Sequence, residues 1–150
     1  MSMGSKVAVR VTGALALSVG LVGSATPLPA QAASDSWGNG YLRLSSTCTG
    51  LGFGSPRINK KLNSGVYLKV YYGSRDGGTN CANLINTSGT KQKLDVYISF
   101  PSADGGGAWD RGSYSSYAGS VLLRGTKNSC IDVVGSVNGK EFNYVNVLCG

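Results

Sequence analysis

Two stretches of this chain alternate apolar and polar residues with a period of two, and this pattern constrains the fold more than any other feature. In residues 65–72 the sequence GVYLKVYY places valine and leucine on one face and Tyr67, Lys69 and Tyr71 on the other. Residues 93–100 (KLDVYISF) repeat the pattern, with Tyr97 on the polar face. A period of two is typical of a β-strand with one buried face.

Five shorter stretches are rich in β-branched and aromatic residues and are bounded by turn-forming residues. They cover residues 41–46, 81–86, 120–124, 129–134 and 141–148. Between the last two, Asn138-Gly139 predicts a tight hairpin turn, because both central positions of such a turn favour residues that accept positive φ. No helix of ordinary length is expected. About seven or eight short strands separated by turns predict an all-β domain, a small antiparallel sandwich or barrel.

The N-terminus reads as a secretory signal peptide covering residues 1–32. Lys6 and Arg10 give it a positive start, and residues 11–22 form an uncharged apolar run. This run is shorter than the roughly 20 residues that span a bilayer, so we expect no stable membrane span. Small residues in Ala30-Gln31-Ala32 favour cleavage before Ala33. The sequence therefore predicts a secreted, extracellular protein.

Behind the signal peptide the chain predicts a single domain. Residues 33–39 are small and polar around one tryptophan, and we expect them to form a flexible lead-in. Residues 40–150 are expected to form one disulfide-stabilised β-domain. Without residues 1–32, twelve basic and seven acidic residues remain, a net charge of +5. The basic residues are scattered, which argues against nucleic acid as a partner and is compatible with anionic wall polymers or spore surfaces.

All four cysteines lie behind the signal peptide: Cys48, Cys81, Cys130 and Cys149. In an exported protein such cysteines form disulfides, and four of them allow three connectivities. We favour Cys48 with Cys81 and Cys130 with Cys149, since the second pair flanks the Asn138-Gly139 turn. Each bridge would stabilise the fold by roughly 3 to 4 kcal/mol. A metal or redox site needs CxxC spacing or histidine partners, which this chain lacks, so we expect no metal and no cofactor.

The chain contains no histidine, and this argues against most hydrolytic mechanisms. A pair of carboxylates, as in glycoside hydrolysis, would have to come from seven acids. These are Asp35, Asp76, Asp95, Asp104, Asp110, Asp132 and Glu141. Asp132 lies in an apolar strand and is best interpreted as an outward-facing or hydrogen-bonded structural residue. Asp104 and Asp110 flank a glycine-rich loop without the spacing of a calcium loop. We therefore expect no enzyme and no catalytic residue.

Aromatic residues provide the candidate binding surface. They are Tyr67, Tyr71, Tyr97, Trp109, Tyr114 and Tyr117. The first three fall on the polar faces of their strands, and the last three cluster around a loop after Gly105. Exposed rings can stack on sugars or contact a protein, and they can also serve only to cover a neighbouring strand.

Several segments of the C-terminal half resemble a known family. Residues 114–121 read YSSYAGSV, Ser129-Cys130-Ile131-Asp132 follows, and the chain closes with Leu148-Cys149-Gly150. These segments, the Asn80-Cys81 step and the layout of a signal peptide with four cysteines resemble the spore-associated protein A family of filamentous actinobacteria. The resemblance implies a small secreted protein associated with spores or aerial structures. It implies no enzyme activity and no catalytic residues.

Two functional hypotheses follow. The first is a secreted, non-enzymatic spore- or cell-surface protein that adheres to a wall or coat polymer or to a partner protein. The alternative is a secreted inhibitor or toxin-like effector that presents a disulfide-braced loop, residues 104–117, to another extracellular protein. The sequence specifies no oligomeric state.

Overall fold

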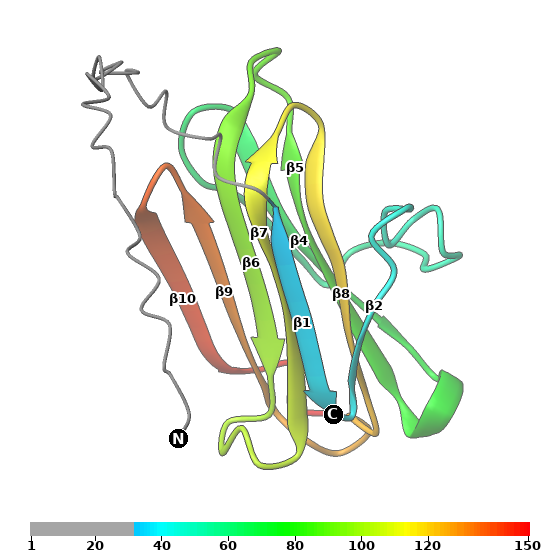
Figure 1. The fold of residues 1–150 in the computed structure, drawn as a ribbon. Coiled ribbons are helices and arrows are strands. Elements are labelled where there is room, and N and C mark those ends of the chain that lie inside the picture. Colours follow the sequence, from blue (N-terminus) through cyan, green and yellow to red (C-terminus); the bar gives the residue numbers. More distant parts are fainter. Residues whose placement is uncertain (1–31) are drawn as a thin grey trace, which may run out of the picture.

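The computed structural model describes residues 32–150, which form two antiparallel five-stranded sheets packed face to face (Figure 1). Sheet A contains, in order across the sheet, β1 (Ala33–Gly38), β7 (Gly106–Tyr114), β6 (Gln92–Ser99), β9 (Ile131–Val137) and β10 (Lys140–Val147). Sheet B contains β2 (Gly40–Leu42), β8 (Tyr117–Arg124), β5 (Thr79–Asn86), β4 (Val66–Gly73) and β3 (Ile58–Lys61). The expected all-β fold is confirmed as a sandwich. The expected signal peptide, apart from Ala32, lies outside the described residues.

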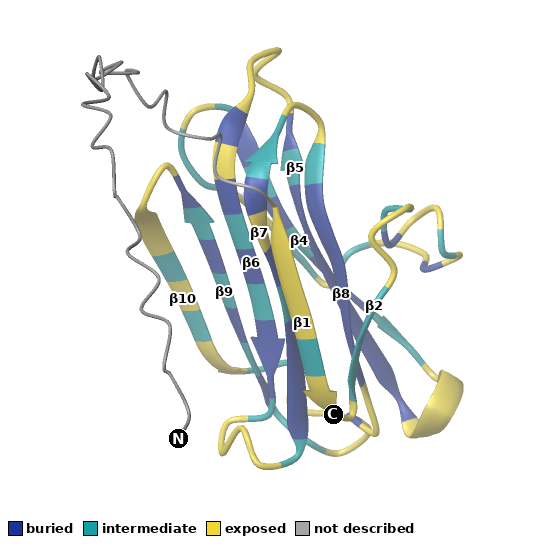
Figure 2. Cartoon of the chain, in the orientation of Figure 1, coloured by how far each residue is buried: buried dark blue, intermediate teal, exposed yellow. Residues whose placement is uncertain are grey.

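The core lies between the sheets and is built from the apolar positions of the alternating strands. Val66, Leu68 and Val70 of β4 and Leu94, Val96 and Ile98 of β6 are all buried. Figure 2 shows that burial is greatest on the central strands, whereas β1 is exposed along most of its length. Within residues 32–150 the helical content is one short 3₁₀ turn, η1 (Arg75–Gly77), and no helix there has the length and apolar character needed to cross a membrane.

All seven expected strands are present, but β1, β3 and β7 were not expected. The largest error concerns β7, because its first residues, Gly106 and Gly107, were interpreted as part of a loop tip. Instead β7 pairs with β1 on one side and with β6 on the other. Its inward positions are small or polar, with Ala108, Asp110 and Gly112 buried, so the strand lacks the apolar alternation that marks β4 and β6.

Residues 33–38, most of the segment expected to be a flexible lead-in, form the edge strand β1 along β7. Trp37 explains why this segment is ordered. Its indole Nε1 donates a hydrogen bond to the Ala103 carbonyl at 3.0 Å. Its ring lies over Gly107, where a Cβ atom would come within 2.5 Å of the indole. The glycine that suggested a loop thus makes room for an aromatic side chain on a strand.

Both expected disulfides are confirmed, as is the hairpin turn between β9 and β10. Asn138 and Gly139 have φ values of 52° and 86°, as a two-residue turn of this kind requires. Cys130 joins Cys149 across this hairpin. Cys48 joins Cys81 of β5 and holds the excursion of residues 43–57 against the outer face of sheet B.

Candidate ligand-binding face

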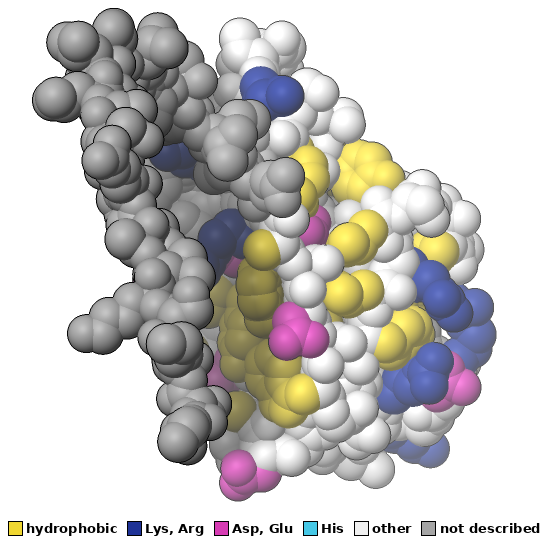
Figure 3. Space-filling view, viewed as in Figure 1, with side chains coloured by type: hydrophobic (Ala, Val, Ile, Leu, Met, Phe, Trp, Pro, Cys, Tyr) yellow, Lys and Arg dark blue, Asp and Glu magenta, His cyan; other side chains and the backbone are white. Residues whose placement is uncertain are grey.

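The outer face of sheet A carries a row of side chains that crosses all five strands. In the register of the sheet, Asp35 lies opposite Trp109, Trp109 opposite Tyr97, Tyr97 opposite Val134, and Val134 opposite Asn143. Side chains on one face of neighbouring strands stand about 4.5 to 5.5 Å apart at Cβ, so the two aromatic rings at the centre of the row are adjacent. Figure 3 shows hydrophobic side chains gathered over β1, β6 and β7.

A second tryptophan extends this aromatic row. The ring centroids of Trp37 and Tyr97 lie 6.0 Å apart with an interplanar angle of 31°. Trp37 is 38% exposed, an unusual value for so large an apolar side chain in a folded domain. We call Trp37, Tyr97 and Trp109 the aromatic platform.

A row of charged and polar side chains lies beside the platform. Arg111, Asp95, Ser136 and Glu141 occupy successive strands in register. Arg111 donates a hydrogen bond from Nε to Asp95 Oδ2 at 2.7 Å, and its guanidinium carbon lies 5.6 Å from the centre of the Trp109 ring. The ion pair and the ring contact together fix the position of this arginine at the edge of the platform.

Two hollows in this face adjoin one another. One, of about 280 Å³, is lined by Tyr97, Trp109 and Asn143, and the other, of about 340 Å³, extends toward Ser136 and Gly139. The two hollows share three lining residues: Asp95, Arg111 and Glu141. They therefore form one shallow groove across β7, β6, β9 and β10. Such a groove can hold an extended ligand, with aromatic faces on one side and hydrogen-bonding groups on the other.

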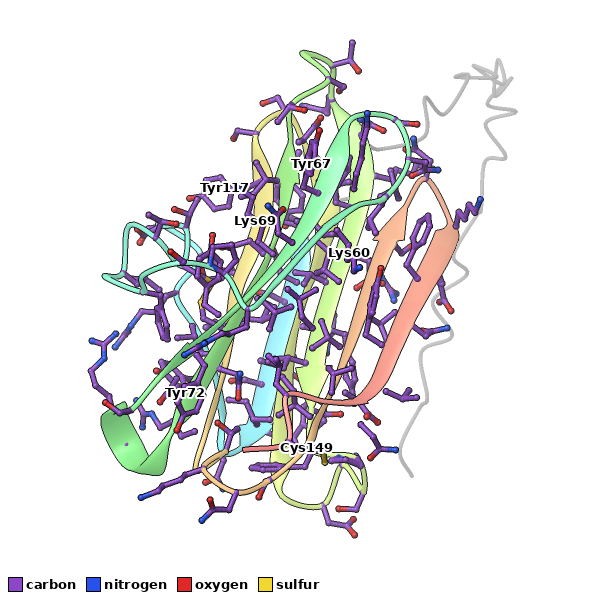
Figure 4. The ribbon with its side chains drawn as sticks, turned by 180° about the vertical axis from the view of Figure 1, so that it is seen from behind. Lys60, Tyr67, Lys69, Tyr72, Tyr117 and Cys149 are labelled. Carbon is purple, nitrogen blue, oxygen red and sulfur yellow. A yellow bond between two sulfur atoms is a disulfide. The ribbon has the colours of Figure 1, made fainter. Side chains whose placement is uncertain are left out.

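The structure divides the six expected binding residues among four places. Tyr97 and Trp109 lie together in the platform. Tyr67 and Tyr117 are half-buried on the outer face of sheet B, in register with Ile85 between them, and Figure 4 shows them near Lys69 on the back of the molecule. Two faces of the sandwich thus carry aromatic residues, and the six do not form one surface.

Tyr71 is buried and Tyr114 is half-buried, so both are less accessible than expected. Tyr71 is 3% exposed, because the excursion of residues 43–57 places Phe53 against it with ring centroids 6.4 Å apart. Tyr114 lies on the inward side of β7 and packs against the core. The burial of both side chains has the same physical cause, because it depends on contacts with segments that are distant in sequence.

Trp37 is the member of the platform that sequence reasoning missed. The signal was present, because an isolated tryptophan among small polar residues needs a partner surface if the segment is ordered. The partner is Gly107, which sequence reasoning assigned to a loop. Most of residues 104–117, the segment expected to form the loop of an inhibitor, is strand β7 of sheet A.

Three of the acids considered in the sequence, Asp104, Asp110 and Asp132, do not line the groove that Asp95 and Glu141 share. Asp132 is half-buried on the outer face of β9, where its Oδ1 accepts a hydrogen bond from the Asn146 amide at 2.8 Å. Asp104 is exposed in the β6–β7 loop, whereas Asp110 is buried in β7. Among residues 32–150 no three acidic or sulfur side chains gather as metal ligands.

Asp110 and Tyr114 form a hydrogen-bonded pair on β7. The Tyr114 hydroxyl donates to Asp110 Oδ1 at 2.6 Å. Burial raises the pKa of Tyr114 above its ordinary value, and the hydrogen bond to Asp110 and the negative charge of that carboxylate raise it further.

This raised pKa predicts a loss of stability in alkali. The ordinary tyrosine pKa is about 10, so above that pH the unfolded chain releases a proton that the folded protein retains. The contribution of Tyr114 to the free energy of unfolding should therefore be constant below about pH 10 and should fall as pH rises beyond it. Tyr114→Phe removes this contribution. Urea denaturation from about pH 8 to pH 11 should show the stability gap between wild type and Y114F narrowing, and a constant gap would contradict the prediction.

Comparison of the chain with protein-family models, with curated proteins and with solved structures finds no match.

Proposed function

We propose that the protein is a secreted, non-enzymatic protein of the cell or spore surface that adheres to a glycan polymer of the wall or coat through the outer face of sheet A. The observation that carries the proposal is the aromatic platform, bordered by the groove that Asp95, Arg111 and Glu141 share. The two disulfides are compatible with an extracellular location. Membership of the spore-associated protein A family is part of this proposal.

The chemistry of the face favours a sugar chain. The face of an aromatic ring is electron-rich, and a pyranose ring presents a patch of C–H groups that carry partial positive charge. Trp109 and Tyr97 lie side by side on neighbouring strands, so successive sugar rings can stack along the row. Hydroxyl groups at the edge of each sugar then meet Asp35, Asn143 and Glu141, which provide hydrogen-bond acceptors and one donor group.

The same residues support adhesion better than hydrolysis. Asp95 and Glu141 line one groove, but Asp95 is held in an ion pair with Arg111. The Asp95 carboxylate thus already has a cationic partner, whereas a glycosidase needs two carboxyl groups that act on the glycosidic bond. Asp95 and Arg111 therefore serve to fix the groove and to bind hydroxyl groups.

Retention on insoluble polymers tests the proposal. The purified protein lacking residues 1–32 should be retained on cell-wall preparations or intact spores, and Trp109→Ala should weaken binding by about tenfold, because a central aromatic anchor contributes 1 to 2 kcal/mol or more. Tyr67→Ala is the matched control, since it removes a half-buried ring from the opposite face of the sandwich. The proposal is wrong if the wild type is not retained, or if W109A and Y67A bind equally.

A further inference from the structure

Three arginines from different segments gather around a small hollow on the outer face of sheet B. Arg43 follows β2, Arg124 ends β8, and Arg75 lies in η1 between β4 and β5. The hollow measures about 180 Å³ and is lined in addition by Tyr41, Leu51, Phe53, Asp76 and Leu122. Figure 3 shows basic side chains beside β2 and η1, apart from the hydrophobic side chains over sheet A.

Aromatic rings hold the arginines in place. The guanidinium carbon of Arg124 lies 4.0 Å from the centre of the Tyr41 ring, and that of Arg43 lies 5.8 Å from the same ring. Arg75 lies 5.2 Å from the centre of the Phe53 ring and donates from Nη2 to the Leu51 carbonyl at 3.3 Å. A guanidinium over a ring face keeps the N–H groups at its edge free to donate to a ligand.

The rings themselves are rigidly supported. Phe53 is 5% exposed and packs in a cluster with Tyr71, Leu122 and the Cys48–Cys81 disulfide, and Tyr41 packs against this cluster. Tyr41 also pairs with Leu122 in the register of β2 and β8. The disulfide fixes the excursion that supplies Leu51 and Phe53. The rings that the three exposed arginines contact are therefore held in place by the fold, which limits the freedom that the arginines lose when a ligand binds.

The positive charge of this cluster is not balanced by the protein. Asp76 is the acid that lines the hollow, and its Oδ2 lies 3.6 Å from Arg124 Nε. Within residues 32–150, neither Arg43 nor Arg75 has a carboxylate within salt-bridge distance. Three guanidinium groups thus face one carboxylate. Their mutual repulsion is relieved by an anion placed between them.

We propose that this hollow is a binding site for a phosphate group, either a free phosphate or the phosphate of a polymer. A guanidinium donates two parallel hydrogen bonds to a phosphate, which explains why arginines rather than lysines surround the hollow. A water molecule occupies about 30 Å³ in the liquid, so 180 Å³ has room for a tetrahedral oxyanion and some water. The site is independent of the aromatic platform, which lies on the other sheet.

Binding of inorganic phosphate and of polyphosphate to the purified protein lacking residues 1–32 tests the proposal. Titration calorimetry should detect at least one of the two, and Arg43→Ala and Arg124→Ala should each weaken binding by about tenfold. Lys91→Ala is the matched control, because Lys91 is an exposed cation in the turn at the end of β5 far from η1. It should leave binding within about twofold of the wild type.

Asp76→Asn provides a test by gain of binding. Asp76 has a φ of 53°, a conformation that asparagine also accepts, so the backbone is preserved. Loss of the single acid should strengthen phosphate binding several-fold, which no purely structural role for the arginines would predict. Tighter binding of polyphosphate than of phosphate, per phosphate group, would assign the site to a polymer, and the reverse would assign it to the free anion.

Two results would overturn the proposal. One is that neither probe binds, and the other is that R43A and R124A bind as K91A does. Trp109→Ala should not change phosphate binding, so failure of this site and failure of the glycan-binding proposal can be told apart.

Discussion

Replacing Cys48 and Cys81 together by serine is expected to lower the free energy of unfolding by about 4 kcal/mol. The two cysteines are separated by 33 residues, and releasing them restores conformational freedom to a long loop of the unfolded chain. Both are fully buried, so the variant also places two hydroxyl groups in the apolar cluster of Phe53, Tyr71 and Leu122. Against a typical total of 5 to 15 kcal/mol, this loss is large.

Urea denaturation at neutral pH measures this loss, and the second disulfide provides the matched control. Cys130 and Cys149 are 19 residues apart, and Cys149 is exposed next to the C-terminal residue. The double serine variant of that pair should lose about 3 kcal/mol, because its loop is shorter and less packing is disturbed. A larger loss at Cys130 and Cys149 than at Cys48 and Cys81 would contradict this ranking. The C48S/C81S variant should also lose phosphate binding, since Phe53 and Leu51 are no longer held.

The sandwich could be predicted because most of its strands can be recognised from a short stretch of consecutive residues. In β4 and β6 every second residue is apolar, and these residues form the centre of the core. The turn at Asn138-Gly139 needs no tertiary contact to be recognised, and it also placed Cys130 near Cys149. Alternation, turn residues and cysteine order are all properties of a short window of sequence.

The candidate site could not be predicted in the same way, because it depends on register. Nothing near Trp109 indicates that Tyr97 stands opposite it or that Trp37 lies within 6.0 Å of that tyrosine. The strand β7 that positions Trp109 contains three glycines, and two of them, Gly107 and Gly112, lie against the rings of Trp37 and Tyr114. The burial of Tyr71 likewise depends on Phe53, which a disulfide brings from another part of the chain.

Asp110→Ala is expected to destabilise the fold by about 3 to 4 kcal/mol through two buried hydrogen bonds. Asp110 is 2% exposed and lies in the middle of β7, the strand that precedes the passage from sheet A to sheet B. Its Oδ1 accepts from the Tyr114 hydroxyl, and its Oδ2 accepts from the Gly119 amide at 2.7 Å, in the irregular part of β8. Removing the carboxylate leaves both donors without an acceptor, at about 1 to 3 kcal/mol each.

Comparison with two further variants separates this mechanism from a general effect of losing an acid. Asp132→Ala removes a half-buried carboxylate with one hydrogen bond to a backbone amide, and it should cost about 1 kcal/mol or less. Tyr114→Phe removes one of the two donors. It should therefore lower the free energy of unfolding of the Asp110→Ala variant by less than it lowers that of the wild type. Urea denaturation of the four proteins of this cycle measures the coupling. The bond between Asp110 and Tyr114 lies within β7, and only the bond to the Gly119 amide joins β7 to β8. Strictly additive losses would therefore show that the Asp110–Tyr114 hydrogen bond contributes nothing to stability.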